Sequence, residues 1–184
     1  MGVVAGIDLA AKPTRCSGFS VIEVKGKKAV LGKAKCLGSD ESILWEVRSS
    51  SPMVVAIDAP LMRNPRMRGV DRELLKRGIR VFPPNFSWMK QLSLRGWRIA
   101  NSIAKLGIEV IETHPRSALL SAGTSNVFEL LQRLGVDIKV DTLRSKDIID
   151  SAVSAAVAYC HLKGCSEIVS DGEYKIYLIK KLSG

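Results

Sequence analysis

The sequence predicts an α/β protein whose mixed β-sheet carries helices on both faces. The first 37 residues read as an apolar strand followed by a hairpin, which together form an antiparallel meander of three strands. Two later apolar runs, MVVAIDAP and IEVIETHP, are separated by helical patterns, as expected of parallel strands buried on both faces. With 184 residues, of which 46% are hydrophobic, the chain is long enough for one domain with a sizeable core.

Each element in the first third of the chain has its own signal. VVAGIDLA (3–10) is an apolar run broken by one carboxylate and reads as a buried strand. The turn AKPTRCSG follows, and the alternation around KGKK predicts a hairpin over 19–37. In SDESILWEVRSS, Ser39 precedes acidic residues and helically spaced apolar residues, so a helix is expected. MVVAIDAP (53–60) is a second apolar strand that Pro60 ends.

The rest of the chain alternates helices with strands. Residues 61–86 are irregular, because NPRMRG and FPPN interrupt regular structure around one short helix, VDRELLKRG. The long helix SKDIIDSAVSAAVAYCHLKG is apolar on nearly every face and is therefore expected to be central. The other expected elements are a helix over 87–107, a strand over 108–115, helices over 115–123 and 124–135, and a hairpin over 167–179 that turns at Asp171-Gly172. Residues 1–184 are expected to form one domain, with 61–106 as a basic insert.

Several classes of protein do not fit the composition. No apolar stretch approaches the ~20 residues of a membrane span, and the N-terminus lacks the pattern of a signal peptide. We therefore expect a cytoplasmic protein without a membrane partner. The four cysteines form no C-x-x-C pair and are accompanied by only two histidines, so a zinc site is not expected. We expect small reduced thiols, with a Cys160–Cys165 disulfide as the alternative.

Three buried strands end in, or nearly in, an acid: Asp8, Asp58 and Glu112. Ligands bind beyond the carboxyl ends of the strands in open α/β sheets, so Asp8 and Asp58 are expected to converge there if their strands are neighbours. Carboxylates that lie close together repel one another, and a hard cation such as Mg²⁺ or Mn²⁺ relieves the repulsion. The alternative for Asp8 is that it accepts hydrogen bonds from the backbone of the following turn.

The long helix supplies two more acids, Asp147 and Asp150, which share one helical face because they are three residues apart. Acids in the first turns of a helix also stabilise its dipole, and this is the alternative for both residues. It is weaker for Asp150, because the residues around it are apolar and a carboxylate there needs a partner.

The net charge of +10 lies almost entirely in the segment 61–106, where eleven Lys and Arg residues face two acids. Arginine is suited to bidentate phosphate contacts, and interleaved aromatic residues can stack on unpaired bases. The aromatic residues are Phe82, Phe86, Trp88 and Trp97. A nucleic-acid partner is therefore expected. In the alternative interpretation the arginines are a solvated face and the aromatics pack the insert onto the body of the domain.

The motifs GIDLA, AIDAP and DIIDSAVSAA together resemble those of the RNase H-like fold. The last motif is similar to the final helix of RuvC-type Holliday junction resolvases, although Ser151 stands where their D-x-x-D-A pattern has alanine. With VDRELLKRG and VIETHPR added, the set most closely resembles a family of predicted RNase H-like nucleases, over nearly the whole chain.

The resemblance implies roles for individual residues. Asp8 would be the metal-bridging carboxylate, Asp58 the second strand-end ligand, and Asp150 the helix ligand with Asp147 as its helper or substitute. Two Mg²⁺ or Mn²⁺ ions would activate a water molecule and stabilise the leaving oxygen of a phosphodiester in DNA or RNA. The expected metal ligands are therefore Asp8, Asp58, Asp147 and Asp150.

Further residues are expected beside these ligands. Glu112 and His114 would face the same cleft, where His114 would orient water or substrate; the equal alternative is that His114 only begins a helix before Pro115. The expected substrate-binding cations are Lys12, Arg15, Arg72 and Arg116. The sequence carries no signature of an oligomeric interface.

Two other functions remain open on the sequence. The first strand and hairpin also resemble those of actin-like ATPases, but the turn lacks the phosphate-binding glycines, and one domain of 184 residues cannot form their two-lobed cleft. A nucleic-acid-binding or protein-binding scaffold, in which the acids are vestigial or structural, is the third possibility.

Overall fold

The strands form one eight-stranded sheet in the order β6-β3-β2-β1-β4-β5-β8-β7. The computed structural model describes residues 2–79, 82, 86–141 and 143–182. The strands are β1 (Gly2–Asp8), β2 (Ser17–Lys25), β3 (Lys28–Leu37), β4 (Val54–Asp58), β5 (Glu109–Thr113), β6 (Val136–Ile138), β7 (Ser166–Ser170) and β8 (Lys175–Ile179). The helices are α1 (Asp40–Ser50), α2 (Gly69–Lys76), α3 (Ser87–Ala104), α4 (Pro115–Ala122), α5 (Val127–Arg133) and α6 (Lys146–Lys163).

The predicted mixed sheet is confirmed. Strands β1, β2 and β3 pair antiparallel as a meander, whereas β4 is parallel to both β1 and β5. Each predicted helix is present, including the one capped by Ser39, whose side chain accepts a hydrogen bond from Ser42 N. The short strand β6 was not predicted. It follows Gly135, whose φ of 67° turns the chain at the end of α5, and it pairs with the outer edge of β3.

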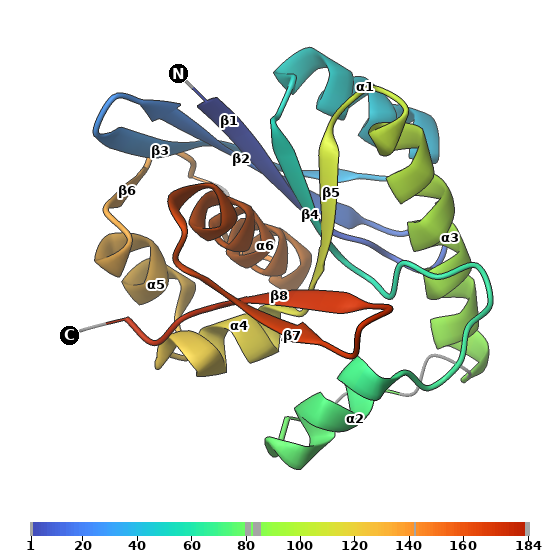
Figure 1. Cartoon of the computed structure of the whole chain (residues 1–184). Helices are drawn as coiled ribbons and strands as arrows, with labels where there is room; N and C mark the ends of the chain where they lie inside the picture. Colours follow the sequence, from blue (N-terminus) through green and yellow to red (C-terminus); the bar gives the residue numbers. More distant parts are fainter. Residues whose placement is uncertain (1, 80–81, 83–85, 142, 183–184) are drawn as a thin grey trace.

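Helices cover both faces of the sheet, as predicted (Figure 1). Helices α4, α5 and α6 lie on one face, and α1 and α3 lie on the other. Each face has its own hydrophobic cluster, because successive strand residues point to opposite sides. In β1, for example, Val4 belongs to the cluster under α6, while Ala5 and Ile7 belong to the cluster under α1 and α3.

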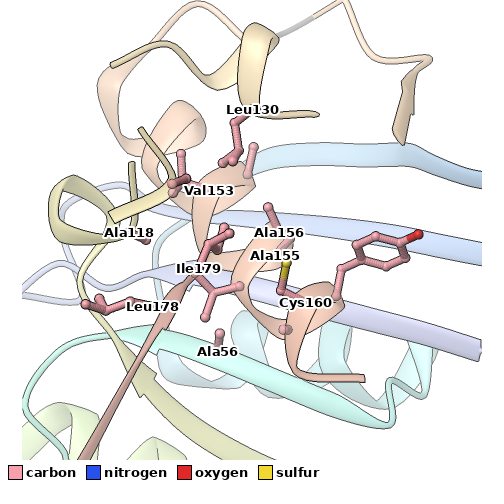
Figure 2. Close-up of a cluster of buried hydrophobic side chains, with 14 of the residues drawn as sticks. Ala56, Ala118, Leu130, Val153, Ala155, Ala156, Cys160, Leu178 and Ile179 are labelled. Carbon is pink, nitrogen blue, oxygen red and sulfur yellow. The ribbon is translucent and has the colours of Figure 1, made fainter. Parts of the chain in front are cut away.

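Helix α6 lies at the centre of the larger cluster, as its apolar sequence predicted. Its buried residues are mostly small, which lets the helix approach the sheet closely. Figure 2 shows Val153, Ala155 and Ala156 of α6 among side chains from β4, α4, α5 and β8. Those neighbours include Ala56, Ala118, Leu130, Leu178 and Ile179.

Two glycines let α6 rest directly on the backbone of the sheet. A Cβ atom on Gly6 of β1 would lie 2.1 Å from Ala155 N and 2.2 Å from Ser151 O. A Cβ atom on Gly18 of β2 would lie 1.9 Å from Asp147 O. These distances are far below any real contact, so the position of the N-terminal half of α6 depends on both glycines.

Replacing Gly6 by alanine is expected to destabilise the fold by at least about 1–3 kcal/mol, because the new methyl group meets helix backbone and not a movable side chain. Urea unfolding measures the change. The matched control is Gly32→Ala in β3, where the nearest atom to the new Cβ is Glu23 Oε1 at 3.6 Å, so little change is expected. Equal stability of the two variants would show that α6 does not rest on β1.

The cysteines differ from the expectation of reduced thiols, because the structure joins them in two disulfides, Cys16–Cys36 and Cys160–Cys165. The first pair meets because the meander places the start of β2 beside the end of β3, where Gly18 is opposite Cys36. The second meets at the end of α6, where Gly164 turns the chain back with a φ of 74°. In the described ranges, no helix is long and apolar enough to cross a bilayer.

Candidate active site

The two strand-end aspartates lie side by side. Asp8 ends β1 and Asp58 ends β4, and they are direct partners in the parallel register of these strands. The alternation of side chains puts both on the face that α6 covers, since Val4 and Ala56, an even number of residues earlier, belong to the cluster under α6. Neither is fully buried, and both line one cavity. The predicted convergence of these two acids is therefore seen in the structure.

Helix α6 brings its acids to the same place. Its first turns rest on Gly18, which is the other register partner of Asp8. The charges of the helix acids repel the strand acids. Burial and the charges of Asp150 and Asp147 raise the pKa of Asp8 to about 7. The pKa of Asp58 is raised by burial and by the charges of Asp8 and Asp150. Asp150 thus acts on both strand acids, and Asp147 on Asp8.

Lys146 accompanies the aspartates. Its Nζ donates to Asp150 Oδ2 at 2.8 Å, and its charge lowers the pKa of both Asp8 and Asp58, opposing their mutual repulsion. With the side chains in their present positions, no three His, Cys, Asp or Glu residues in the described part of the chain are close enough together to hold a metal ion. The donor type and charge nevertheless suit a hard divalent cation, because the acids present carboxylate oxygens that repel one another.

The raised pKa of Asp8 makes stability depend on pH. Between about pH 4 and pH 7, Asp8 binds more protons in the folded protein than in the unfolded chain, so its contribution to the free energy of unfolding falls as the pH rises. Asp8→Asn is expected to remove this contribution. In chelator, the variant should exceed the wild type in stability by roughly 2–4 kcal/mol at pH 7.5 and by little at pH 4. Urea unfolding at both values checks this, with Asp137→Asn at an exposed position of β6 as control. A difference independent of pH would contradict it.

Glu112 does not join the aspartates. It is the register partner of Ile57, so its side chain starts on the α3 face, opposite to that of Asp58. Its carboxylate accepts hydrogen bonds from Arg68 Nη1 at 2.8 Å and Nη2 at 2.6 Å, and from Leu61 N at 2.9 Å. Glu112 borders the cavity, as expected from the sequence, but its oxygens are engaged by Arg68 and Leu61.

Arg68 is the residue that sequence reasoning missed. It precedes α2, and its side chain is 2% exposed between Glu112 and Asp71, to which it also donates two hydrogen bonds. The guanidinium carbon lies 5.2 Å from the ring centroid of Tyr174 in the β7–β8 hairpin. Burial alone would lower the pKa of Arg68, but the hydrogen bonds and charges of Glu112 and Asp71 raise it. Two features of the sequence could have indicated this pairing: the lone acid in the apolar run VIETHP and the R-x-x-D spacing of Arg68 and Asp71.

His114 borders the cleft, as predicted, and it is also the N-cap residue of α4. It therefore has both of the positions expected from the sequence, one facing the cleft and one at the start of a helix. Its Nδ1 shares a short hydrogen bond with Ser117 Oγ, which is fully buried. Burial lowers the pKa of His114, the charge of Asp150 opposes this, and the charges of Arg116 and Lys146 add to it. His114 is therefore favoured in its neutral form, with the orientation of the ring set by Ser117.

Two adjoining cavities form a cleft over the carboxylates. The first, of about 280 Å³, contains Asp8 and Asp58 together with His114 and the aromatic residues Phe82 and Trp88. The second, of about 590 Å³, is bordered by Lys12 and Arg15. The residues that line both cavities are Asp8, Leu9, Trp88, Leu92 and Lys146. The cleft thus runs from the aspartates to two of the predicted substrate-binding cations.

The basic segment is only partly a solvated surface. Arg68 and Arg95 are buried, while Arg66 and Arg77 pair with Glu173 and Glu167 of β7 and its turn. Arg63 lies over the ring of Trp97. The remaining described cations of the segment are exposed: Arg72, Lys76, Lys90, Arg98 and Lys105. Arg80 lies outside the described residues.

The other two predicted substrate-binding cations, Arg72 and Arg116, do not border the cleft. Both are exposed, on α2 and α4, and neither lines the two cavities formed by the described residues. Arg116 still acts on the cleft electrostatically, through its charge on His114.

Arg95 fixes the turn that follows Asp8. It lies in α3 with 1% of its side chain exposed, and it donates to Ala10 O at 2.6 Å, Gly38 O at 2.9 Å and Asp40 Oδ1 at 2.7 Å. One side chain therefore joins the segment after β1 to the start of α1. Its neighbour Gly96 allows this close packing, because a Cβ there would lie 3.0 Å from Ala59 Cβ.

Solved structures with a similar fold include two of RuvC. Thermus thermophilus RuvC in complex with a Holliday junction substrate is similar with a TM-score of 0.58 and 16% sequence identity, covering 88% of this chain and 96% of that one. A second Thermus thermophilus RuvC structure has a TM-score of 0.54 and 17% identity over the same shares. No protein-family model matches the sequence, and no curated protein matches it significantly. The RNase H-like fold implied by the sequence motifs is thereby confirmed.

Proposed function

We propose that the protein is a divalent-metal-dependent nuclease that hydrolyses phosphodiester bonds in DNA or RNA. The observation that carries the proposal is the meeting of Asp8 and Asp58, in register on one face of the sheet, with the acids of α6 above them. Burying like charges together lowers the stability of the fold, so acids with only a structural role are not expected to cluster in this way.

Asp8, Asp58 and Asp150 would hold the metal, with Asp147 beside Asp8 as a further ligand. Mg²⁺ or Mn²⁺ bound there would supply an activated water and charge stabilisation at the scissile phosphate. The side chains around them would set the geometry. Arg95 fixes the turn after Asp8, and Gly6 and Gly18 fix the height of α6 above the strands.

The cleft supplies groups that suit a nucleic acid. Lys12 and Arg15 would contact backbone phosphates in the second cavity, and the exposed Arg72 of α2 and Arg116 of α4 would contact phosphates outside it. Trp88 and Phe82, which are 46% and 66% exposed and in edge-to-face contact, would stack on an unpaired base. The RuvC structure with a Holliday junction substrate is in keeping with this class of partner.

Glu112 and His114 would have different tasks from the aspartates. Glu112 would hold Arg68 and Leu61 in place and so shape the wall of the first cavity. His114, held by Ser117, would orient water or substrate as a neutral imidazole.

The direct test is cleavage of a panel of single-stranded, duplex, hybrid and branched DNA and RNA in Mg²⁺ or Mn²⁺. The wild type and the control Asp137→Asn are expected to cut at least one substrate, and chelator is expected to stop both. Asp8→Asn and Asp58→Asn are expected to lose about a thousandfold in rate, because each removes a carboxylate on which metal binding depends. Cleavage by none of the proteins, or equal cleavage by Asp8→Asn, would refute the proposal.

A further inference from the structure

Lys146 stands at the mouth of the aspartate cluster without a role in the proposed chemistry. It is the first residue of α6, and its side chain is 86% exposed. Its Nζ lies 2.8 Å from Asp150 Oδ2, and Lys146 lines both cavities of the cleft. The ammonium group is thus hydrogen-bonded to one of the carboxylates and borders the cleft from which a cation would reach them.

A lysine at position 146 is electrostatically unfavourable for helix α6. A helix N-terminus carries partial positive charge, so a lysine in the first turn is unfavourable there, whereas Asp147 next to it is favourable. Ser145 already caps the helix through Ile148 N at 3.3 Å, so Lys146 is not needed for that purpose. Local rules that are broken without a local gain are expected at functional sites.

The reason for the lysine lies in the groups that face it. On neighbouring strands the acids are Asp8 of β1 and Asp58 of β4, and on α6 itself they are Asp147 and Asp150. His114 at the start of α4 also feels its charge. The hydrogen bond to Asp150 and the charges of Asp150, Asp8 and Asp58 raise the pKa of Lys146, so the ammonium stays charged. Its charge therefore reaches strand acids as well as its helix neighbour.

We propose that Lys146 is the resident counter-cation of the aspartate cluster in the metal-free protein and competes with divalent metal for these carboxylates. The inference rests on the proposed metal site and deepens it. Lys146 offsets the repulsion among the acids when metal is absent, and its ammonium must leave Asp150 when metal enters. It thereby sets the metal concentration at which the site fills.

Metal affinity tests the competition without reference to catalysis. Mn²⁺ binding is followed by electron paramagnetic resonance in the wild type and in Lys146→Met, which is expected to bind roughly tenfold more tightly because one positive charge is removed. Lys146→Arg keeps the charge and should bind like the wild type. Lys76→Met, which removes an exposed lysine of α2 that pairs with Glu73, should also leave binding unchanged. Equal affinity of Lys146→Met and the wild type would overturn the inference.

Melting temperatures in chelator at pH 8 test the counter-ion role separately. Lys146→Met is expected to melt roughly 2–4 °C below the wild type. In the Asp8→Asn background the same substitution should cost less, because one of the charges that Lys146 balances is gone. A lysine that only paired with Asp150 on the helix surface would cost the same in both backgrounds, and that result would overturn the inference.

The two sets of measurements separate the inference from the proposed function. If Asp8→Asn loses Mn²⁺ binding while Lys146→Met binds like the wild type, the metal site stands and the competition is refuted. If neither the wild type nor Lys146→Met binds Mn²⁺, the proposed metal site is refuted and the competition with it. The melting temperatures then decide whether Lys146 is a counter-ion of the acids alone.

Discussion

Replacing Arg68 by methionine is expected to lower the free energy of unfolding by about 3–5 kcal/mol, because two buried carboxylates lose their only described cation. Asp71 and Glu112 are 5% and 8% exposed, so solvent cannot replace the guanidinium. Methionine fills much of the same space, which leaves charge and not a cavity as the main cause. Urea unfolding at pH 7 measures the effect.

The matched control is Arg66→Met, two residues earlier. Arg66 pairs with Glu173, but both side chains are more than half exposed, so the loss is expected to stay below about 1 kcal/mol. Adding Glu112→Gln to Arg68→Met should recover part of the lost stability, because it removes one of the unpaired charges. If Arg68→Met were as stable as Arg66→Met, Arg68 would not hold the wall of the cleft.

Asp150→Asn is expected to reduce cleavage about a thousandfold, and Asp147→Asn by no more than about tenfold. The charge of Asp150 acts on both Asp8 and Asp58, whereas that of Asp147 acts on Asp8, and Asp147 lines the second cavity. We therefore propose Asp150, and not Asp147, as the helix acid that completes the metal site with Asp8 and Asp58. Single-turnover cleavage rates in Mg²⁺, under conditions where the wild type is active, provide the comparison.

Both variants keep the helix and its cap at Ser145, since asparagine is nearly the same size as aspartate. Far-UV circular dichroism should therefore show the same helix content as in the wild type, which excludes unfolding as the cause of lost activity. A larger loss in Asp147→Asn than in Asp150→Asn would mean that the two helix acids have exchanged the roles assigned to them.

The strand-end aspartates could be predicted from the sequence because periodicity and topology determine them. A single carboxylate at the end of an apolar run must reach the rim of the sheet, and parallel neighbours bring such ends together. The spacing of Asp147 and Asp150 is equally local, because residues three apart share a helical face. These parts of the site follow from short-range rules.

Glu112 could not be placed from the sequence, because its face depends on register. Its partner is Ile57 and not Asp58, and a shift of one residue moves a side chain to the opposite side of the sheet. Periodicity within β5 alone does not fix the pairing with β4. Register is a property of two strands, and it became known only from the structure.

The roles of Arg68 and Arg95 also depend on distant partners. Both were counted among the cations of a nucleic-acid-binding segment, yet each is buried by contacts with residues far away in the chain, such as Glu112 and Ala10. The cysteine pairs and β6 are similar cases, because each joins elements that are brought together by the folded chain. Net charge in a segment therefore overstates its exposed charge.

The proposed nuclease depends on the binding of a divalent metal by Asp8, Asp58 and Asp150 together. Anomalous scattering from a crystal of the full chain soaked in Mn²⁺ tests it most directly. We expect a manganese peak coordinated by these three carboxylates, with the Lys146 ammonium moved away from Asp150. A crystal saturated with Mn²⁺ that shows no peak at the carboxylates, with Lys146 still bound to Asp150, would contradict it.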